Sequence, residues 1–293
     1  MAVLDRTVQA PDGRTLLVEE GGDPAGRPIL ELAGTPNSRH LYGPHLAHAA
    51  THGIRLIGYD RPGYGGSTPQ PGRTVADCAG DVRAIADALK IDQFAIWGIS
   101  GGGPHALACA ALLADRAVAV ASQASLAPYG APGLDYFAGM GEMNVDDIKL
   151  MLEDPDAARL KTAADRETML TATPEGIRTF METLLTPTDT AVLTGELADH
   201  LARDAKDGLA PGIQGWWDDG WAHIQPWGFE VEAIRLPVML WHGRQDRFVP
   251  FGHGEWLAKR IPAVDAHLTD EDGHLTLIQR RIPAVHSWLL EHF

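Results

Sequence analysis

The strongest constraint on the fold of this chain is a strand-like segment that runs directly into a Gly-x-Ser-x-Gly turn and then into a helix. Residues 93–98 are mostly apolar, Gly98, Ser100 and Gly101 shape the turn, and residues 104–113 are small and apolar. Only glycine fits the sharp bend at positions 98 and 101 without a Cβ clash. The bend also places the serine hydroxyl at a helix N-terminus, where free backbone N–H groups can meet developing negative charge. Ser100 is therefore a candidate nucleophile.

Two further residues, Asp246 and His274, are of the types that a catalytic triad needs beside a serine. Asp246 follows the strand-like residues 238–243, and His274 follows the strand-like residues 266–269, just before the last helix. All three residues then lie on loops at the carboxyl ends of parallel strands, in the chain order Ser, Asp, His. In such a unit His274 takes the proton of Ser100, while Asp246 fixes the imidazole tautomer and stabilises the imidazolium.

Other carboxylates and histidines compete for these roles. Asp270 and Asp272 lie close to His274 in the sequence. So short a separation favours a role in shaping its turn over accepting its Nδ1–H. His105, on the helix after the serine turn, is expected to be structural. His242 ends a strand where it can contact the acid loop, but nothing gives it a role in proton transfer.

On these residues the chain resembles the α/β-hydrolase superfamily over nearly its full length, the middle excepted. Residues 58–67 resemble the family's glycine-rich loop after its fourth strand, and residues 32–38 resemble its His-Gly-x-Pro loop after the third strand. The resemblance implies an oxyanion hole made by the backbone N–H groups of Thr35 and Gly101, each donor being worth about 10²–10³ in rate. Ala33 stands where the family usually has a histidine that braces this loop.

The resemblance also narrows the chemistry. Family members that act on halides or epoxides usually carry an aspartate nucleophile, whereas this chain has Ser100. Proline-specific aminopeptidases of the family usually have a Gly-Gly-Ser-Trp-Gly-Ser turn, which residues 97–102 do not match. Small-molecule esterases, including tailoring methylesterases, are therefore the nearer expectation.

The order of strand-like and helical segments indicates an α/β fold with a mostly parallel sheet covered by helices on both faces. We expect a core made of residues 1–133 and 228–293, interrupted by an insertion at residues 134–227. Pro283 is expected to bend or restart the last helix. The strands are expected near Thr7–Gln9, Thr15–Glu20, Pro28–Leu32, Arg55–Tyr59, Gln93–Gly98, Ala117–Ser122, Val238–Gly243 and Ala266–Thr269, and the core helices near His40–His52, Thr74–Leu89, Ser100–Leu113, Gly254–Arg260 and Leu275–Phe293.

The insertion is expected to form a helical cap, or lid, over the active site. Its apolar residues recur at helical spacing around residues 148–152 and 180–185. Methionine and tryptophan side chains in the cap are suited to line an apolar acyl or ring pocket. The alternative for each of them is packing of the cap onto the core, but we expect at least two or three to face the substrate. The candidates for the pocket are Met140, Met143, Trp216, Trp217 and Trp221.

Charge and composition restrict the partners. Residues 134–230 contain 19 acidic and seven basic side chains, a net charge of −12 out of −15 for the whole chain. Solvated helix faces explain this excess most simply, but a field that reaches the site would disfavour anionic substrates, and nucleic acid is an unsuitable partner. The N-terminus lacks a signal-peptide pattern, and no apolar run reaches the ~20 residues that span a bilayer. Cys78 and Cys109 fit a reducing compartment, and a cytoplasmic location is expected.

The sequence therefore predicts a serine hydrolase that cleaves an ester, or a related acyl bond, of a small, largely apolar and neutral substrate. An acyl-Ser100 intermediate carries the reaction, and neither a cofactor nor a metal is expected. The same fold and triad also serve carbon–carbon bond hydrolysis, acyl transfer and perhydrolysis, which pocket shape separates and sequence does not. A non-catalytic small-molecule receptor is the alternative from another class, and the complete set of Ser100, Asp246 and His274 argues against it.

Overall fold

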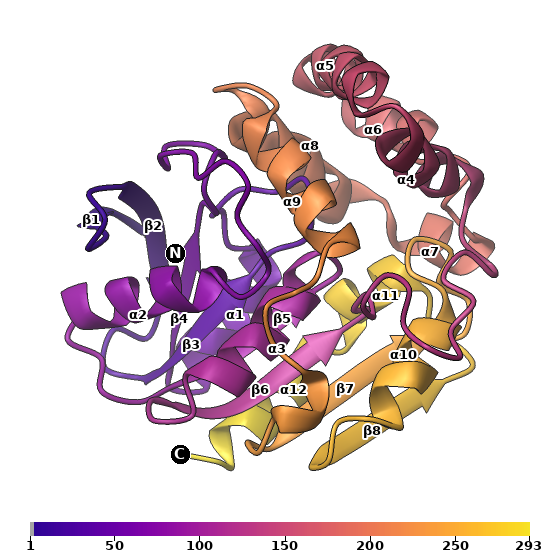
Figure 1. Ribbon diagram of the computed structural model, residues 1–293. Helices are drawn as coiled ribbons and strands as arrows, with labels where there is room; N and C mark the ends of the chain where they lie inside the picture. Colours follow the sequence, from indigo (N-terminus) through magenta and orange to yellow (C-terminus); the bar gives the residue numbers. More distant parts are fainter. Residues whose placement is uncertain (1–2) are drawn as a thin grey trace.

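Eight strands form one sheet in the computed structural model, which describes residues 3–293 (Figure 1). They are β1 (Leu4–Gln9), β2 (Thr15–Gly22), β3 (Arg27–Leu32), β4 (Ile54–Tyr59), β5 (Phe94–Ile99), β6 (Ala117–Gln123), β7 (Val238–Gly243) and β8 (Val264–Thr269). Their order across the sheet is β1-β2-β4-β3-β5-β6-β7-β8. β2 pairs antiparallel with β1 and β4, and every other pairing is parallel. The predicted α/β fold is confirmed.

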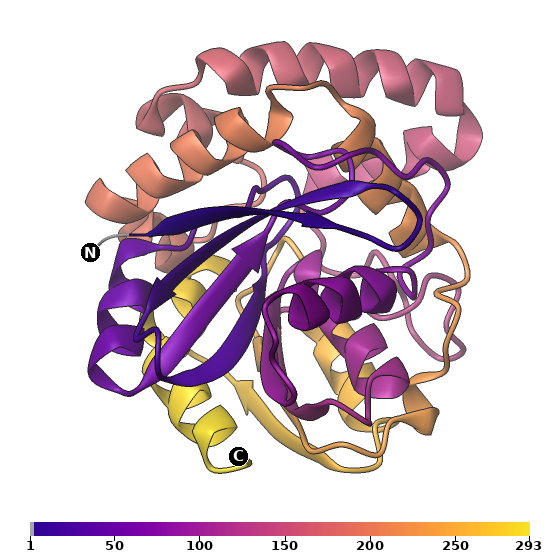
Figure 2. The same ribbon diagram turned by 90° about the vertical axis from the view of Figure 1, so that its left-hand side faces the viewer.

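Helices cover both faces of this sheet (Figure 2). One face carries α1 (Gly43–Thr51), α11 (His274–Arg280) and α12 (Ile282–Leu290). The other face carries α2 (Cys78–Ala88), α3 (Gly102–Leu112), α10 (Phe251–Ala258) and the short 3₁₀-helix η1 (Val231–Ala233). A parallel sheet needs this double cover, because its strands are apolar on both sides.

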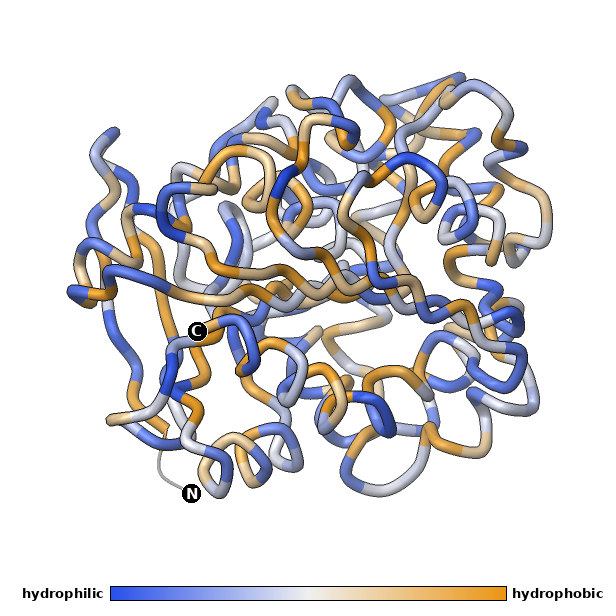
Figure 3. The backbone as a smooth tube through the Cα atoms, turned by 90° about the horizontal axis from the view of Figure 1, so that it is seen from below, coloured by the Kyte–Doolittle hydropathy of each residue, from blue (hydrophilic) through white to orange (hydrophobic). Residues whose placement is uncertain are grey.

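The central strand β5 shows how the sequence produces two cores. Its side chains alternate between the faces, so that Ile96 packs among residues on the α2 and α3 side while Trp97 packs on the α1 and α12 side. Every residue of β5 is buried. In Figure 3 the apolar colouring accordingly follows the strands between the two helical layers.

A run of six helices lies above the carboxyl edge of the sheet (Figure 1). They are α4 (Glu142–Glu153), α5 (Pro155–Thr171), α6 (Pro174–Phe180), α7 (Pro187–Val192), α8 (Gly195–Leu209) and α9 (Gln214–Ile224). We call residues 142–224 the helical segment. It is joined to the core by two apolar clusters, one around Leu197 and Leu275 and the other around Tyr64 and Leu209.

One predicted helix end agrees with the structure and one predicted helix does not. The last helix restarts as predicted: α11 ends at Arg280 and α12 begins at Ile282, with Pro283 in its first turn, where proline is tolerated. Residues 180–185 do not form the single helix that their spacing suggests. Helix α6 ends at Phe180, and the chain turns toward Pro187, which opens α7. Within residues 3–293, no helix is long and apolar enough to cross a membrane.

Candidate active site

The serine turn joins β5 to α3 in the way the sequence predicts. Ser100 adopts the left-handed conformation with φ at +54°, which costs a non-glycine residue about 1–3 kcal/mol. Two backbone hydrogen bonds of 2.9 Å hold the bend: Ser100 N–H donates to the carbonyl of Gln123, and Gly103 N–H donates to the carbonyl of Ser100. A Cβ at Gly98 would lie 2.7 Å from Ala106 Cβ, so glycine is required there.

Asp246 and His274 are brought together from the loops after β7 and β8. Nδ1 of His274 lies 2.7 Å from Oδ2 of Asp246, an arrangement in which Nδ1–H donates and Nε2 is left as an acceptor. The other carboxyl oxygen of Asp246 accepts N–H groups from Phe248 and Val249, both at 2.8 Å. The Phe248 ring stacks on the imidazole with centroids 4.5 Å apart. The histidine is thus fixed both in tautomer and in ring plane.

Ser100 and His274 line the same chamber, although their side chains are not hydrogen-bonded to each other in this structure. Such bonds are often long before substrate binds. Burial lowers the pKa of His274, but the charge and hydrogen bond of Asp246, together with the charge of Asp189, outweigh it and hold the pKa above its usual value of 6.5. The ring is therefore a stronger base than an ordinary histidine.

Asp189 is a carboxylate of α7 that the sequence analysis did not single out. It is fully buried and accepts backbone N–H groups at the start of α11, from His274 at 3.1 Å and from Leu275 at 2.7 Å. Burial raises the pKa of Asp189. A carboxylate of the helical segment therefore holds the backbone of the predicted catalytic histidine.

The competing acids serve other partners. Asp270 is exposed and pairs with Arg244 at 2.5 Å. Asp272 is buried, but its carboxyl group accepts from Thr269 at 2.7 Å and pairs with Arg281 at 3.0 Å. Neither carboxyl group bonds the imidazole of His274. Both shape the loop that leads into α11.

The histidines set aside as structural have structural partners. His242 is buried and its Nε2–H donates to the carbonyl of Val249 at 2.8 Å, on the acid loop. His105 is buried between the carbonyl of Val75, 3.3 Å from Nδ1, and the carboxyl group of Asp219, 3.4 Å from Nε2. Within residues 3–293, no group of three or more His, Cys, Asp or Glu side chains is arranged to hold a metal ion.

The predicted oxyanion donors, Thr35 and Gly101, lie side by side. A Cβ added at Gly101 would lie 2.9 Å from Thr35 Cβ, so only glycine permits this approach. Neither backbone N–H donates to another described residue. Both residues border the space in front of Ser100.

The guanidinium group of Arg61 bonds the loop at residues 33–35, where Ala33 stands in place of the family's usual histidine. Arg61, from the loop after β4, donates to the carbonyl oxygens of Ala33 and Gly34, the latter at 2.7 Å. It also donates to the hydroxyl of Thr35 at 3.1 Å. A residue from another loop therefore bonds the segment where the family's usual histidine is absent.

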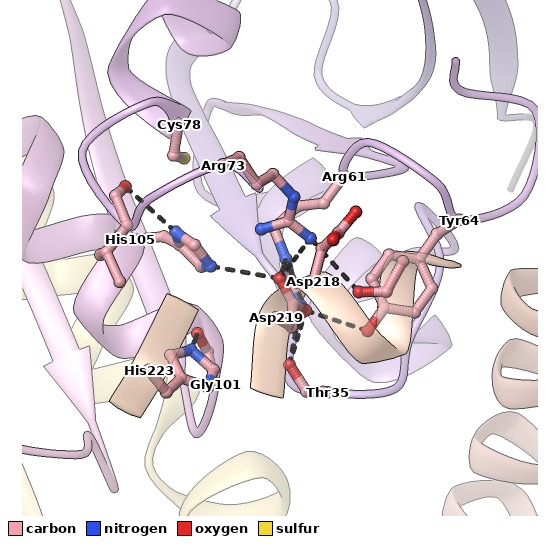
Figure 4. A network of polar contacts seen from close by, with 12 residues as sticks. Thr35, Arg61, Tyr64, Arg73, Cys78, Gly101, His105, Asp218, Asp219 and His223 are labelled. Carbon is pink, nitrogen blue, oxygen red and sulfur yellow. Dashed lines mark hydrogen bonds and ion pairs between the residues drawn. The ribbon is translucent and has the colours of Figure 1, made fainter. Parts of the chain in front are cut away.

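Asp219 of α9 completes this support from above (Figure 4). Its carboxyl group is fully buried and lies 2.6 Å from a nitrogen of Arg61 and 2.6 Å from a nitrogen of Arg73. It also accepts the hydroxyls of Thr35 at 2.7 Å and Tyr64 at 3.0 Å. Burial alone raises the pKa of Asp219, but the two guanidinium groups outweigh it and hold the pKa well below its usual range. The carboxyl group of Asp219 thus connects the helical segment to the loop that carries Thr35.

His223, one turn after Asp219, contacts the other side of the same hole. Its Nε2–H donates to the carbonyl of Gly101 at 3.1 Å. Burial lowers the pKa of His223 to about 3, so the ring is neutral at physiological pH. Helix α9 therefore contacts both residues of the predicted oxyanion hole.

Two chambers meet at Ser100. The histidine chamber lies on the α1 side and is lined by Glu31, Tyr42, His45, Trp97, His200 and Ile278. The methionine chamber lies under α4, α5 and α9 and is lined by Met140, Met143, Ile148, Met151, Leu184 and Trp216. Thr35, Met169, Met181 and Phe248 border both chambers. A bond cleaved at Ser100 therefore has room for a group on each side.

Only some of the predicted pocket residues are placed at these chambers. Met140, Met143 and Trp216 line the methionine chamber. Trp217 and Trp221 lie elsewhere and stack on each other with ring centroids 6.0 Å apart. The guanidinium group of Arg159 lies over the Trp217 ring, with its central carbon 4.2 Å from the ring centroid. These two rings pack the helical segment internally, which corrects their expected place in the pocket.

Comparison with known proteins shows the family of this chain. A family model described as alpha/beta hydrolase fold matches residues 27–280. The chain belongs to the α/β-hydrolase fold family. The hydrolase is 28% identical over 268 residues to AB hydrolase superfamily protein YisY of Bacillus subtilis (strain 168), a match that covers 89% of this chain and 88% of that protein.

Two further similarities concern proteins with named activities. The hydrolase is 25% identical over 259 residues to a non-heme chloroperoxidase of Streptomyces lividans, covering 84% of this chain and 83% of that protein. A solved structure of a thermophilic esterase from Thermogutta terrifontis superposes with a TM-score of 0.71 at 20% identity, covering 99% of this chain and 100% of that chain. At this level of identity the likeness to the esterase shows the fold alone.

Proposed function

We propose that this hydrolase cleaves an ester of a small, neutral and largely apolar substrate through an acyl-Ser100 intermediate. The observation that carries the proposal is the 2.7 Å contact between His274 and Asp246 in a chamber that also contains Ser100 on its left-handed turn. A strained serine that shares a chamber with an oriented imidazole is the arrangement that supports nucleophilic acyl transfer.

The proposed reaction assigns each step to a residue of this site. Ser100 Oγ attacks the carbonyl carbon while Nε2 of His274 takes its proton, and the carbonyl oxygen becomes an anion facing the N–H groups of Thr35 and Gly101. The imidazolium then protonates the leaving alcohol as the tetrahedral intermediate collapses to the acyl-enzyme. Water then attacks the acyl-enzyme and loses a proton to His274, and the imidazolium gives this proton to Ser100 Oγ as the acid is released. Asp246 stabilises the imidazolium in both halves.

The substrate class follows from the walls of the two chambers. The methionine chamber is mostly apolar, with flexible Met140, Met143 and Met151 side chains that can adapt to an apolar group. We propose that residues 134–227 act as the cap that closes over this space. The net charge of −12 on residues 134–230 disfavours an anionic substrate at the mouth.

This charge preference gives a direct prediction. We expect p-nitrophenyl butyrate to be hydrolysed with a higher kcat/KM than p-nitrophenyl hemisuccinate, which carries a free carboxylate, and we expect added salt to reduce the difference. The measurement is kcat/KM for both esters at low and high ionic strength. Faster turnover of the free-acid ester at low salt would contradict the proposed substrate class.

A second prediction concerns pH. His274 must be neutral to accept a proton, so kcat/KM for a neutral ester should fall as the pH drops through a His274 pKa that lies above 6.5. Replacing Asp189 by Asn removes a charge that favours the imidazolium. The pKa of His274 then falls, and the acid limb of the kcat/KM profile should move to lower pH by roughly 0.5–1 unit.

The matched control is Asp156→Asn, an equivalent change at an exposed position of α5. Its pH profile should coincide with that of the wild type. An acid limb that stays in place in Asp189→Asn, or moves to higher pH, would show that Asp189 does not act on His274 as proposed.

The chloroperoxidase similarity makes perhydrolysis the second candidate to test, because the same acyl-enzyme can be attacked by peroxide instead of water. A product-ratio assay in mixtures of water with alcohol or hydrogen peroxide separates the reactions. Hydrolysis predicts the free acid as the main product. A preference for peroxide or alcohol far above its mole fraction would change the assignment to perhydrolysis or acyl transfer. Ligand binding without turnover, unaffected by Ser100→Ala, would instead indicate a receptor.

A further inference from the structure

The histidine chamber is lined in part by polar side chains that the proposed reaction does not use. Glu31, His45 and His200 line this chamber together with Ser100. Glu31 is only 8% exposed and His45 only 3% exposed. Among residues 3–293, no hydrogen-bond partner is present for Glu31 Oε2, His45 Nδ1 or His200 Nδ1.

Three elements of the fold bring these side chains together. Glu31 lies near the carboxyl end of β3, opposite Trp97 of β5, and therefore on the α1 side of the sheet. Helix α1 supplies His45, whose ring packs edge-on against Trp97 with centroids 5.1 Å apart. Helix α8 of the helical segment supplies His200. A carboxyl group at the carboxyl end of a buried strand is where this class of sheet presents groups to a ligand.

The contacts of Glu31, His45 and His200 leave several of their hydrogen-bonding atoms without a partner among the described residues. Nε2 of His45 lies 2.9 Å from the carbonyl oxygen of Ile278, which can only accept, so Nε2 carries hydrogen and Nδ1 of the neutral ring is an acceptor. Nδ1 is 3.6 Å from Oε2 of Glu31, beyond hydrogen-bond distance. Buried polar atoms without a partner are rare in folded proteins, and each such atom calls for an explanation.

The surroundings of Glu31 disfavour its charged form. Burial raises the pKa of Glu31, His45 offsets this only in part, and the nearby Asp204 and Glu19 raise it further. Burial lowers the pKa of His200 to about 4, so this ring is neutral at physiological pH. Burial therefore disfavours the charged forms of both Glu31 and His200.

We propose that Glu31, His45 and His200 form a subsite that binds a hydroxyl group on the substrate, several bonds away from the ester carbonyl. The proposal rests on the ester hydrolysis proposed above, because the same chamber opens onto Ser100. A hydroxyl group both donates and accepts, so it can pair with the carboxyl group and with an imidazole nitrogen at once. The substrate is then a hydroxylated ester with a polar group in the histidine chamber and an apolar group in the methionine chamber.

Ions fit this site less well than a hydroxyl group. A carboxylate would meet the carboxyl groups of Glu31 and Asp204, which both line this chamber. An ammonium group has three donors and no acceptor, so it can pair only with acceptor atoms, whereas a hydroxyl group can also accept the hydrogen of a protonated Glu31. The test therefore includes a charged analogue of each kind.

The experiment compares matched esters in which a hydroxyl or a methyl group occupies the same position. One series carries the group on the acyl side and the other carries it on the alcohol side, at increasing distance from the carbonyl. We expect at least one hydroxylated ester to exceed its methyl analogue in kcat/KM by about 10- to 100-fold, as expected for a hydrogen bond to a buried polar site. Ammonium and carboxylate analogues should show no such gain.

The variant Glu31→Leu should bring the hydroxyl-to-methyl ratio of kcat/KM near one, and Glu31→Gln, which keeps an acceptor oxygen, should retain part of it. Glu153→Leu, the same change at an exposed site of α4, should keep the wild-type ratio. A purely structural Glu31 would lower turnover of both esters and leave the ratio unchanged, which would overturn the proposal. So would a preference for the ammonium or carboxylate analogue, or a ratio near one throughout both wild-type series.

Failure of this subsite is distinguishable from failure of the proposed reaction. A fluorophosphonate adduct on Ser100, together with turnover of p-nitrophenyl butyrate, establishes the reaction independently of any hydroxyl group. If both are present and the ratio stays near one, the subsite proposal alone is wrong. If neither is present, the reaction and the subsite that depends on it are both wrong.

Discussion

Replacing Asp246 by Asn is expected to reduce kcat for ester hydrolysis by about 10⁴-fold while leaving the fold intact. The carboxylate accepts the Nδ1–H of His274 at 2.7 Å and two backbone N–H groups of its own loop. An amide of the same shape offers an N–H toward His274, so the ring reverses its tautomer and Nε2 can no longer take the proton of Ser100. The imidazolium also loses its counter-ion. The measurements are kcat on a neutral aryl ester and the thermal unfolding midpoint.

The matched control for this variant is Asp270→Asn, on the loop that carries His274. Asp270 is exposed and pairs with Arg244, so its replacement should change kcat by less than about twofold. If Asp270→Asn lost as much activity as Asp246→Asn, or if Asp246→Asn remained active, the acid of the triad would have to be sought elsewhere.

Replacing Asp219 by Asn is the second change with a large expected effect. Asp219 is a buried carboxylate between Arg61 and Arg73, and its loss leaves two buried guanidinium groups without their counter-ion. Breaking such a pair costs about 3–5 kcal/mol of stability. Because Arg61 and Asp219 also hold the hydroxyl of Thr35, we expect kcat to fall by about 10- to 100-fold with a smaller change in KM. Denaturant unfolding and steady-state kinetics measure the two effects.

Two further variants separate stability from positioning. Asp218→Asn changes the neighbouring residue of α9, whose carboxyl group bonds Gln214 instead of the arginines, and it should leave kcat within about twofold. Thr35→Val keeps every charge and removes only the hydroxyl, so kcat should fall while the unfolding midpoint stays close to the wild type. An undiminished kcat in both Asp219→Asn and Thr35→Val would show that the network supports the fold and not the oxyanion loop.

The residues of the proposed triad could be singled out because each is marked by local sequence. A sharp turn between a strand and a helix requires glycine at fixed positions, and the structure shows the close approaches that exclude larger residues at Gly98 and Gly101. The acid and the histidine follow recognisable strands, so chain order and sheet geometry place them at one edge. The restart of the last helix at Pro283 was predictable for the same reason, because the restriction on proline is local.

The support of the oxyanion loop could not be predicted in this way. Arg61 and Asp219 are 158 residues apart in the chain, and only the docking of α9 joins them. The acidic residues of the helical segment read most simply as solvated helix faces, yet Asp189, Asp204 and Asp219 are buried and bond the core. Charge counts do not separate a surface carboxylate from one buried against an arginine. The sequence feature that could have drawn attention to Arg61 is its position next to Asp60 in the glycine-rich loop.

The most direct test of the central claim is the intact mass of the protein after treatment with a fluorophosphonate, a reagent that phosphonylates activated serines. The arrangement of Ser100, His274 and Asp246 predicts one adduct on the wild type and none on Ser100→Ala. No adduct on the folded wild type, or an equal adduct on Ser100→Ala, would contradict the assignment of Ser100 as the activated nucleophile.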